Sequence, residues 1–140
     1  GSYGVVTVEN STFAGGRDFI RADAGRVTDE ALALARESDV VVIESNYDVD
    51  MLMGGPYPRE LKMRICGGSG HLSNDECAAA LRLIWHPGLR NIFLCHLSEN
   101  NNTPELALEA SSKALSDAGG AVVTNLYALP RTDRSRFFIL

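Results

Sequence analysis

The sequence predicts an α/β fold, because helical segments alternate with short runs of apolar residues. Residues 40–43 and 92–95 are apolar throughout, which is typical of strands buried on both faces of a sheet. Between them, Ser73 and Glu76 have the spacing of a capping box, which marks the start of a helix. Strands and helices that alternate in this way predict a sheet layered with flanking helices.

The N-terminal part is expected to contribute two strands and a helix. Strands are predicted at residues 4–9 and 17–22, joined by a polar turn that contains two glycines. A helix is predicted from Thr28 to about Glu37, because the threonine hydroxyl can cap backbone amides and acidic residues follow in the first turn.

The middle of the chain combines an irregular segment with a well-marked helix. Residues 46–70 are rich in Gly and Pro and are expected to be irregular, except for a helical stretch at 58–65. The helix after Ser73 should end at Pro87 and bury one face. Apolar side chains repeat along that face at i, i+4 and i+7: Cys77, Leu81 and Ile84.

The C-terminal part is expected to hold a long helix and two closing strands. Thr103 is a capping residue, and proline and an acidic residue follow it, which is a strong helix start. The helix should run to about Ala118 and end at the two following glycines. Residues 122–129 and 137–140 are predicted as strands.

Length and composition indicate one globular domain over residues 1–140, with 45% hydrophobic and 22% charged residues. No apolar run approaches the roughly 20 residues that a membrane span needs. An odd count of three cysteines without a Cys-x-x-Cys pair, together with no visible secretory signal, favours a reducing cytoplasm over a disulfide framework. The start in mid-pattern favours a missing upstream segment.

The net charge of −5 argues against a broadly basic nucleic-acid-binding face. It does not exclude a nucleic-acid substrate, because bound divalent cations would invert the local field and are not counted in the formal charge.

Four titratable residues stand where turns follow or precede regular elements. Asp23, Glu44 and His96 each close an apolar segment, and His71 lies just before the capped helix. Strands that end at one edge of a sheet bring their terminal residues together. A carboxylate and imidazoles at such an edge are typical of a metal-assisted hydrolytic site.

Each of these residues also has a purely structural interpretation. Asp23 can be a turn aspartate that bonds its own backbone, and Glu44 can face solvent at a strand end. His71 can be a loop histidine without a role, and His96 a structural histidine. His86 lies at a helix C-terminus, where a histidine suits the helix dipole.

The order of the motifs is more specific than any one of them. The segments that carry it are ADAGRVTDE (22–30), ESNYDVDMLMGGPYPRELKMRI (44–65), GHLSND (70–75) and HLSENNNTPELA (96–107). Together they resemble the second half of the metallo-β-lactamase fold, and most closely the YycJ/WalJ-type metallo-hydrolases, which include 5′-to-3′ DNA exonucleases. The resemblance implies the C-terminal half of an αββα sandwich, with a mixed sheet and flanking helices.

The resemblance also implies roles for individual residues. Asp23 would bridge two metal ions and His96 would bind the second of them. His71 would protonate the leaving group, and Glu44 would orient and charge it. The implied cofactors are two divalent ions, zinc or manganese.

The resemblance also implies supporting and substrate-binding residues in the segment 46–65. Asn46 and Asp48 would support the site, and Lys62 and Arg64 would contact substrate phosphates. For the two cations, an exposed helix face is the alternative interpretation.

The departure from the family pattern is large. The family's H-x-H-x-D-H motif, which belongs to the first half of the fold and supplies most metal ligands, is absent. We therefore expect a half-sandwich whose second sheet face is exposed, and which pairs with the missing N-terminal half or self-associates. The chain alone is expected to be inactive.

Three functions remain open from the sequence. The first is part of a metal-dependent DNA exonuclease, with DNA as the substrate. The second is a metallo-hydrolase that acts on a small phosphodiester or ester, and the third is a non-catalytic fragment or interaction module.

Overall fold

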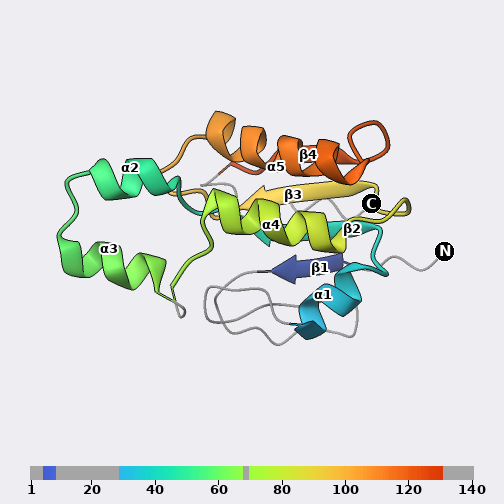
Figure 1. Ribbon diagram of the computed structural model, residues 1–140, viewed down its shortest axis with the longest axis horizontal. Coiled ribbons are helices and arrows are strands. Elements are labelled where there is room, and N and C mark those ends of the chain that lie inside the picture. Colours follow the sequence, from blue (N-terminus) through green and yellow to red (C-terminus); the bar gives the residue numbers. More distant parts are fainter. Residues whose placement is uncertain (1–4, 9–28, 68–69, 131–140) are drawn as a thin grey trace.

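Strands and helices alternate along the part of the chain that the computed structural model describes, residues 5–8, 29–67 and 70–130 (Figure 1). In chain order the elements are β1 (Val5–Val8), α1 (Asp29–Ala35), β2 (Val40–Glu44), α2 (Val49–Gly54), α3 (Arg59–Cys66), α4 (Asn74–Ile84), β3 (Asn91–Cys95), α5 (Pro104–Ala118) and β4 (Asn125–Ala128). The α/β class predicted from the sequence is confirmed.

The strands form one sheet in the order β1-β2-β3-β4, and each of the three described pairs is parallel. The register places Val41 beside Ile92 and Ile92 beside Leu126. A mixed sheet was predicted, but the described strands form a parallel one, in which β1 also pairs with β2 in parallel. The predicted partner strand at 17–22 and the closing strand at 137–140 lie outside the described residues.

Helices α4 and α5 cover one face of the sheet, and this interface is the main core (Figure 1). Alternate side chains of β2 and β3 point into it, as strand geometry requires. Those buried side chains are Val41, Ile43, Ile92 and Leu94. The predicted apolar face of α4 is confirmed, because Cys77, Leu81 and Ile84 are at most 1% exposed.

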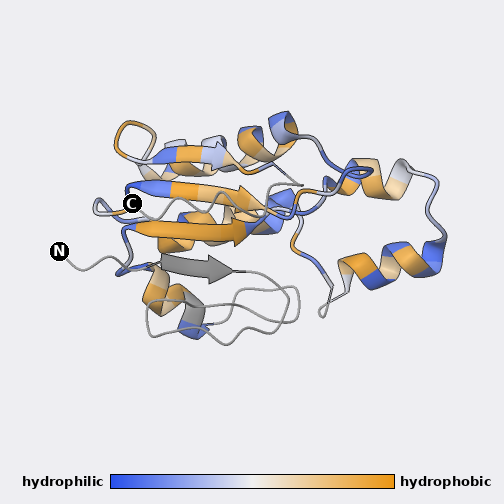
Figure 2. Cartoon of the chain, turned by 180° about the vertical axis from the view of Figure 1, so that it is seen from behind, coloured by the Kyte–Doolittle hydropathy of each residue, from blue (hydrophilic) through white to orange (hydrophobic). Residues whose placement is uncertain are grey.

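The opposite face of β2 and β3 is also apolar, and Figure 2 shows these strands in the colour of hydrophobic residues. Its side chains form a second cluster, which is Val40, Val42, Phe93 and Cys95 with Leu129 packed against it. The four strand residues are at most 7% exposed. At these positions the face is therefore buried, as the continuous apolar runs predicted, whereas the resemblance to half of a sandwich led us to expect an exposed face.

Helix α2 corrects the expectation that residues 46–57 are irregular. Asp48 is its N-cap, and the side chain accepts a hydrogen bond from the Met51 backbone amide at 2.9 Å. Aspartate is a favoured N-cap, so a signal was present, but the glycines and prolines that follow obscured it. The helix predicted at 58–65 is confirmed as α3.

The caps of the two longer helices form as predicted. Ser73 accepts from the Glu76 amide, and the Glu76 side chain accepts from the Ser73 amide, both at 3.0 Å. Thr103 caps α5, which ends at Gly119 with a φ of 92°, the left-handed conformation that glycine adopts at little cost.

Strand β4 is shorter than the predicted strand at 122–129. The backbone turns at Gly120, where the amides of Val123 and Thr124 bond to its carbonyl. Val122 lies in this turn and is 94% exposed, despite its β-branched side chain. Gly120 is required there, since a Cβ would lie 2.1 Å from the Trp85 ring nitrogen.

No disulfide joins Cys66, Cys77 and Cys95, which agrees with the odd cysteine count. Cys77 is fully buried, and burial raises the pKa of its thiol to about 12, so it packs as a neutral apolar side chain. Among the helices of the described residues, none has the length and apolar character to cross a membrane.

Candidate functional site

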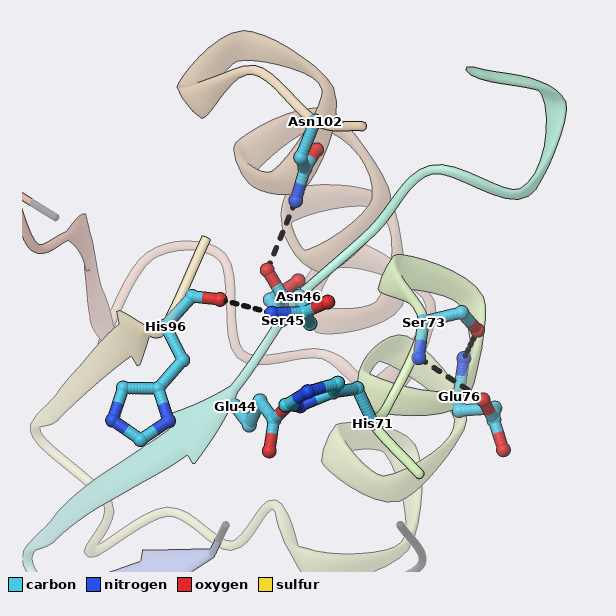
Figure 3. Close-up of polar contacts among 8 residues, drawn as sticks. All are labelled: Glu44, Ser45, Asn46, His71, Ser73, Glu76, His96 and Asn102. Carbon is cyan, nitrogen blue, oxygen red and sulfur yellow. Dashed lines mark hydrogen bonds and ion pairs between the residues drawn. The ribbon is translucent and has the colours of Figure 1, made fainter. Parts of the chain in front are cut away.

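Three loops meet at the carboxyl edge of the sheet, beyond the arrowheads of β2 and β3 (Figures 1 and 3). The segment after β2 lies between the other two. On one side the Asn46 amide donates to the Leu72 carbonyl at 2.9 Å, and on the other the Ser98 amide donates to the Asn46 carbonyl at 2.7 Å. The chain thus brings residues 45–48, 70–74 and 96–102 into one layer.

A buried cluster of polar side chains ties these loops together. The Ser45 hydroxyl donates to Asn74 Oδ1 at 2.6 Å, and Asn74 Nδ2 donates to Asn102 Oδ1 at 2.8 Å. Asn102 Nδ2 donates to the Ser45 carbonyl at 2.9 Å (Figure 3). Because each buried amide is hydrogen-bonded, the cluster fixes the start of α4 and of α5 relative to the end of β2.

Glu44 and His71 form an ion pair within this layer. The Nδ1 atom of His71 lies 2.5 Å from Glu44 Oε1, with the glutamate side chain 0% and the imidazole 39% exposed. Since a carboxylate can only accept, Nδ1 carries the hydrogen and Nε2 is the nitrogen left for an external group. The structure therefore supplies an acidic partner for His71, as the resemblance implied.

The environment of His71 favours its charged form. The hydrogen bond to Glu44 raises the pKa of His71 above its ordinary value of 6.5, burial opposes this, and the negative charge of Glu44 adds to the increase. A larger share of the imidazole is thus protonated near neutral pH than in an exposed histidine.

Gly70 allows His71 to lie close to the end of α3. The His71 amide donates to the Ile65 carbonyl at 2.9 Å. A Cβ on Gly70 would lie 2.2 Å from that same carbonyl oxygen and 2.4 Å from the Arg64 oxygen. Only glycine fits this close backbone approach, which explains why Gly precedes His in the sequence.

His96 follows β3 with an unusual backbone. Its φ is 55°, in the left-handed region that residues other than glycine adopt rarely. Its carbonyl accepts from Asn46 Nδ2 at 2.6 Å, which helps to hold this conformation (Figure 3). Such strain persists only where the surroundings impose it, and it is found often at functional sites.

An open pocket of about 550 Å³ lies between these loops and α3. This volume is within the range of small-molecule sites. The described residues that line it are Asn46, Tyr57, Leu61, Ile65, His71, His96, Leu97, Ser98 and Asn101.

The residues predicted for the site are placed as follows. His71, His96 and Asn46 line the pocket, and Glu44 lies behind His71. Asp23 lies outside the described residues. The roles assigned to these residues stay predictions.

Two further predicted residues lie away from the pocket lining. Lys62 Nζ donates to the Met53 carbonyl at 2.8 Å and so links α3 to α2. Arg64 is exposed on α3, and neither cation is among the described residues that line the pocket. Their predicted contact with substrate phosphates remains a prediction.

The described residues do not assemble a metal site. Within residues 5–8, 29–67 and 70–130, no three His, Cys, Asp or Glu side chains are grouped so that they could hold an ion. His96 is the one predicted ligand in this part of the chain, and one imidazole does not make a site for zinc or manganese. The described residues therefore do not test the predicted metal centre, since its other predicted ligand, Asp23, lies outside them.

The sequence did not predict that the three consecutive asparagines, residues 100–102, have different contacts. Asn100 Nδ2 donates to the Tyr57 hydroxyl at 3.0 Å, Asn101 lines the pocket, and Asn102 belongs to the buried cluster. The polar run was visible in the sequence, but the partners come from distant segments. No local signal identified Tyr57 as a pocket residue.

The fold and this layer define an α/β domain with a histidine–carboxylate pair and a second histidine beside an open pocket, at the carboxyl edge of a parallel sheet. The chain is 37% identical over 100 residues to Exodeoxyribonuclease YycJ of Bacillus anthracis, a match that covers 71% of this chain and 38% of that protein. It is 40% identical over 85 residues to Exodeoxyribonuclease WalJ of Streptococcus pneumoniae strain D39, covering 61% of this chain and 32% of the relative.

The WalJ protein of Streptococcus pneumoniae strain R6 matches to the same extent. The chain is thus similar to part of these YycJ/WalJ-type proteins, which agrees with the resemblance seen in the motifs. It spans about a third of the length of the curated relatives it matches. No family model matches the chain.

Proposed function

We propose that this chain provides the proton-donating half of a DNA exonuclease site, with His71 as the general acid and Glu44 as its partner. The observation that carries the proposal is the 2.5 Å pair between a fully buried carboxylate and an imidazole that lines the pocket. The names of the curated relatives support the choice of DNA as the substrate.

The proposed step is the departure of the leaving oxygen in phosphodiester hydrolysis. As water attacks phosphorus, the bond to the leaving oxygen breaks and negative charge develops on that oxygen. Protonated His71 donates from Nε2 to this oxygen, while Nδ1–H stays bonded to Glu44. The imidazole ends neutral and still oriented, because its second nitrogen is held throughout.

The metal ions implied by the family resemblance stay a prediction. Two zinc or manganese ions, held in part by Asp23 and His96, would polarise the phosphate and activate water. The described residues do not complete such a site, so no step above is assigned to a metal. The cytoplasmic location and the pairing with an N-terminal half are likewise predictions.

The test is a kinetic comparison of His71→Ala and Glu44→Gln with the unmodified gene product that carries this sequence. Hydrolysis of an end-labelled DNA duplex is measured across pH. We expect His71→Ala to lower kcat by about 10²–10⁴-fold, which is the usual contribution of a general acid. The basic limb of the pH profile should move to lower pH in Glu44→Gln, because the pKa of His71 loses the cause of its increase.

His86→Gln is the matched control, since His86 bonds the Ser38 carbonyl near the opposite edge of the sheet. Its kcat should equal that of the unmodified protein. Unchanged kcat in His71→Ala would exclude proton donation by His71.

The alternative substrate, a small phosphodiester or ester, is separated by salt dependence. DNA affinity that falls steeply as salt rises indicates real phosphate contacts. A flat response, combined with hydrolysis of bis(p-nitrophenyl) phosphate alone, would favour the small substrate. If the unmodified protein turns over neither DNA nor the small substrate, the non-catalytic alternative remains.

A further inference from the structure

The pocket beside His71 has two unlike walls. The sheet-edge loops supply a polar wall of imidazole, amide and hydroxyl groups, while the segment from Tyr57 to Ile65 supplies an apolar one. Proton transfer by His71 makes no use of the apolar wall. It therefore needs a separate explanation.

Tyr57, Leu61 and Ile65 follow one another at intervals of four residues, and all three line the pocket. Four residues is slightly more than one helical turn, so Leu61 and Ile65 lie on the same face of α3 and Tyr57 extends that face beyond its N-terminus. The result is a continuous strip that consists of one aromatic ring and two branched aliphatic chains.

The ring of Tyr57 is held in place from both ends. Its hydroxyl accepts a hydrogen bond from Asn100 Nδ2 at 3.0 Å. Its backbone directly precedes Pro58, which restricts the φ and ψ angles open to it. A ring fixed in this way loses little conformational entropy when a ligand binds against it.

We propose that this strip is a subsite for a nucleobase at the end of the DNA strand, which stacks on Tyr57 while its phosphate faces His71. The inference rests on the proposed function and adds the group that positions the strand terminus. Aromatic side chains bind every base through its π-face, so such a subsite tolerates any sequence.

The polar wall suits the rest of a nucleotide. Asn46, Ser98 and Asn101 offer amide and hydroxyl groups for the sugar and phosphate oxygens. The described lining includes no acidic side chain, and Glu44 is fully buried behind His71, so a phosphate meets no exposed carboxylate there. A volume of about 550 Å³ leaves room for one nucleotide.

The experiment measures binding of a short single-stranded oligonucleotide with 2-aminopurine as its terminal base, whose fluorescence falls when the base stacks. The unmodified protein should quench the probe. Tyr57→Ala should abolish the quenching and weaken binding about tenfold, the loss expected for one stacking contact. Tyr57→Phe should retain the quenching, because it keeps the ring and removes only the bond to Asn100.

Tyr127→Ala is the matched control, since Tyr127 is an exposed tyrosine on β4 that stacks on Phe93 and is not among the residues of the pocket lining. It should bind the probe as the unmodified protein does. Thermal melts confirm that each variant is folded. Equal quenching by the unmodified protein and Tyr57→Ala, or no quenching by either, would overturn the subsite.

The readout separates this inference from the proposed function, because it does not require cleavage. DNA hydrolysis with unaltered binding in Tyr57→Ala would reject the base subsite and leave the exonuclease proposal intact. Stacking that depends on Tyr57, without hydrolysis by the gene product, would support the subsite and reject the exonuclease.

Discussion

The Glu44 side chain has no exposure to solvent, and the imidazole of His71 is its charged neighbour at 2.5 Å. An ionised carboxylate in such a place needs partners, because burying an unpaired charge costs several kcal/mol. The pair therefore contributes to the stability of the loop layer as well as to the proposed chemistry.

Glu44→Gln should make the stability of the protein depend less on pH. The pKa of His71 is raised in the folded state, so the stabilisation by the pair is complete below pH 6.5 and is lost as the pH rises through the raised pKa. The unmodified protein should therefore exceed the variant in free energy of unfolding most below pH 6.5. Urea denaturation over a pH series measures this difference.

An NMR titration gives an independent check of the same prediction. The His71 ring signals should titrate at lower pH in Glu44→Gln than in the unmodified protein. The chemical shifts of His86, which bonds to Ser38, show whether the fold is intact. Identical His71 curves in the two proteins would contradict the assigned cause.

From the residues alone, Glu44 was either a buried carboxylate that needs a partner or a glutamate that faces solvent at a strand end. The family resemblance implied His71 as its partner, and the structure pairs the two side chains. Tyr57 shows the limit of such reasoning, because its place in the pocket depends on how α3 packs beyond the sheet edge. Nothing in its neighbours along the chain specifies that position.

The elements around the site are joined by side-chain hydrogen bonds in addition to the backbone bonds between the loops. Ser45, Asn74 and Asn102 link the end of β2 to the starts of α4 and α5 through hydrogen bonds of 2.6–2.9 Å. Helix starts carry unpaired amides, which is why capping residues gather in the same layer.

Asn102→Ala should cost about 2–3 kcal/mol in free energy of unfolding, because it leaves buried polar groups of Asn74 and Ser45 without these bonds. Urea denaturation measures the change. Asn125→Ala is the control, since its amide is exposed and bonds Asn91 at 3.3 Å, and the cost should stay within about 0.5 kcal/mol. Equal costs at both positions would mean that the buried cluster adds nothing.

Helices whose start and end are both marked in the sequence were predicted most closely, although α3 was also predicted without a side-chain cap. The Ser73 capping box and the Thr103-Pro104 start defined α4 and α5 closely. Helix α2 was missed because its Asp48 cap precedes only six helical residues before Gly and Pro. Val122 and Val123 favoured a strand by propensity, but the turn at Gly120 and the bonds of Thr124 prevailed.

At the scale of the whole molecule, stability depends on the interface between the sheet and α4. Leu81→Ala should lower the free energy of unfolding by about 2–5 kcal/mol, because the side chain is fully buried and its removal leaves a cavity. Leu83→Ala on the same helix should change it by less than about 0.5 kcal/mol, since Leu83 is 54% exposed. Chemical denaturation measures the free energy of unfolding of both variants. Similar decreases in the two would contradict the assignment of Leu81 to the core.

The class of fold could be read from alternating apolar runs and helices, but the sheet order could not. Apolar strands such as residues 40–43 and 92–95 look alike in sequence, and their pairing depends on contacts between distant segments. The continuous apolar runs did predict the burial of both faces at Val42 and Phe93, against the exposed face that the resemblance implied. Sequence patterns define which side chains are buried, and not what covers them.

The connection from β2 to β3 has two parts that occupy different places in the fold. Helix α4 packs on the sheet and closes the parallel crossover, whereas α2 and α3 extend past the strand ends and carry one wall of the pocket (Figure 1). Sheet register does not depend on how long that extension is. A change in the α2–α3 segment would therefore alter the apolar wall of the pocket while leaving the pairing of the strands intact.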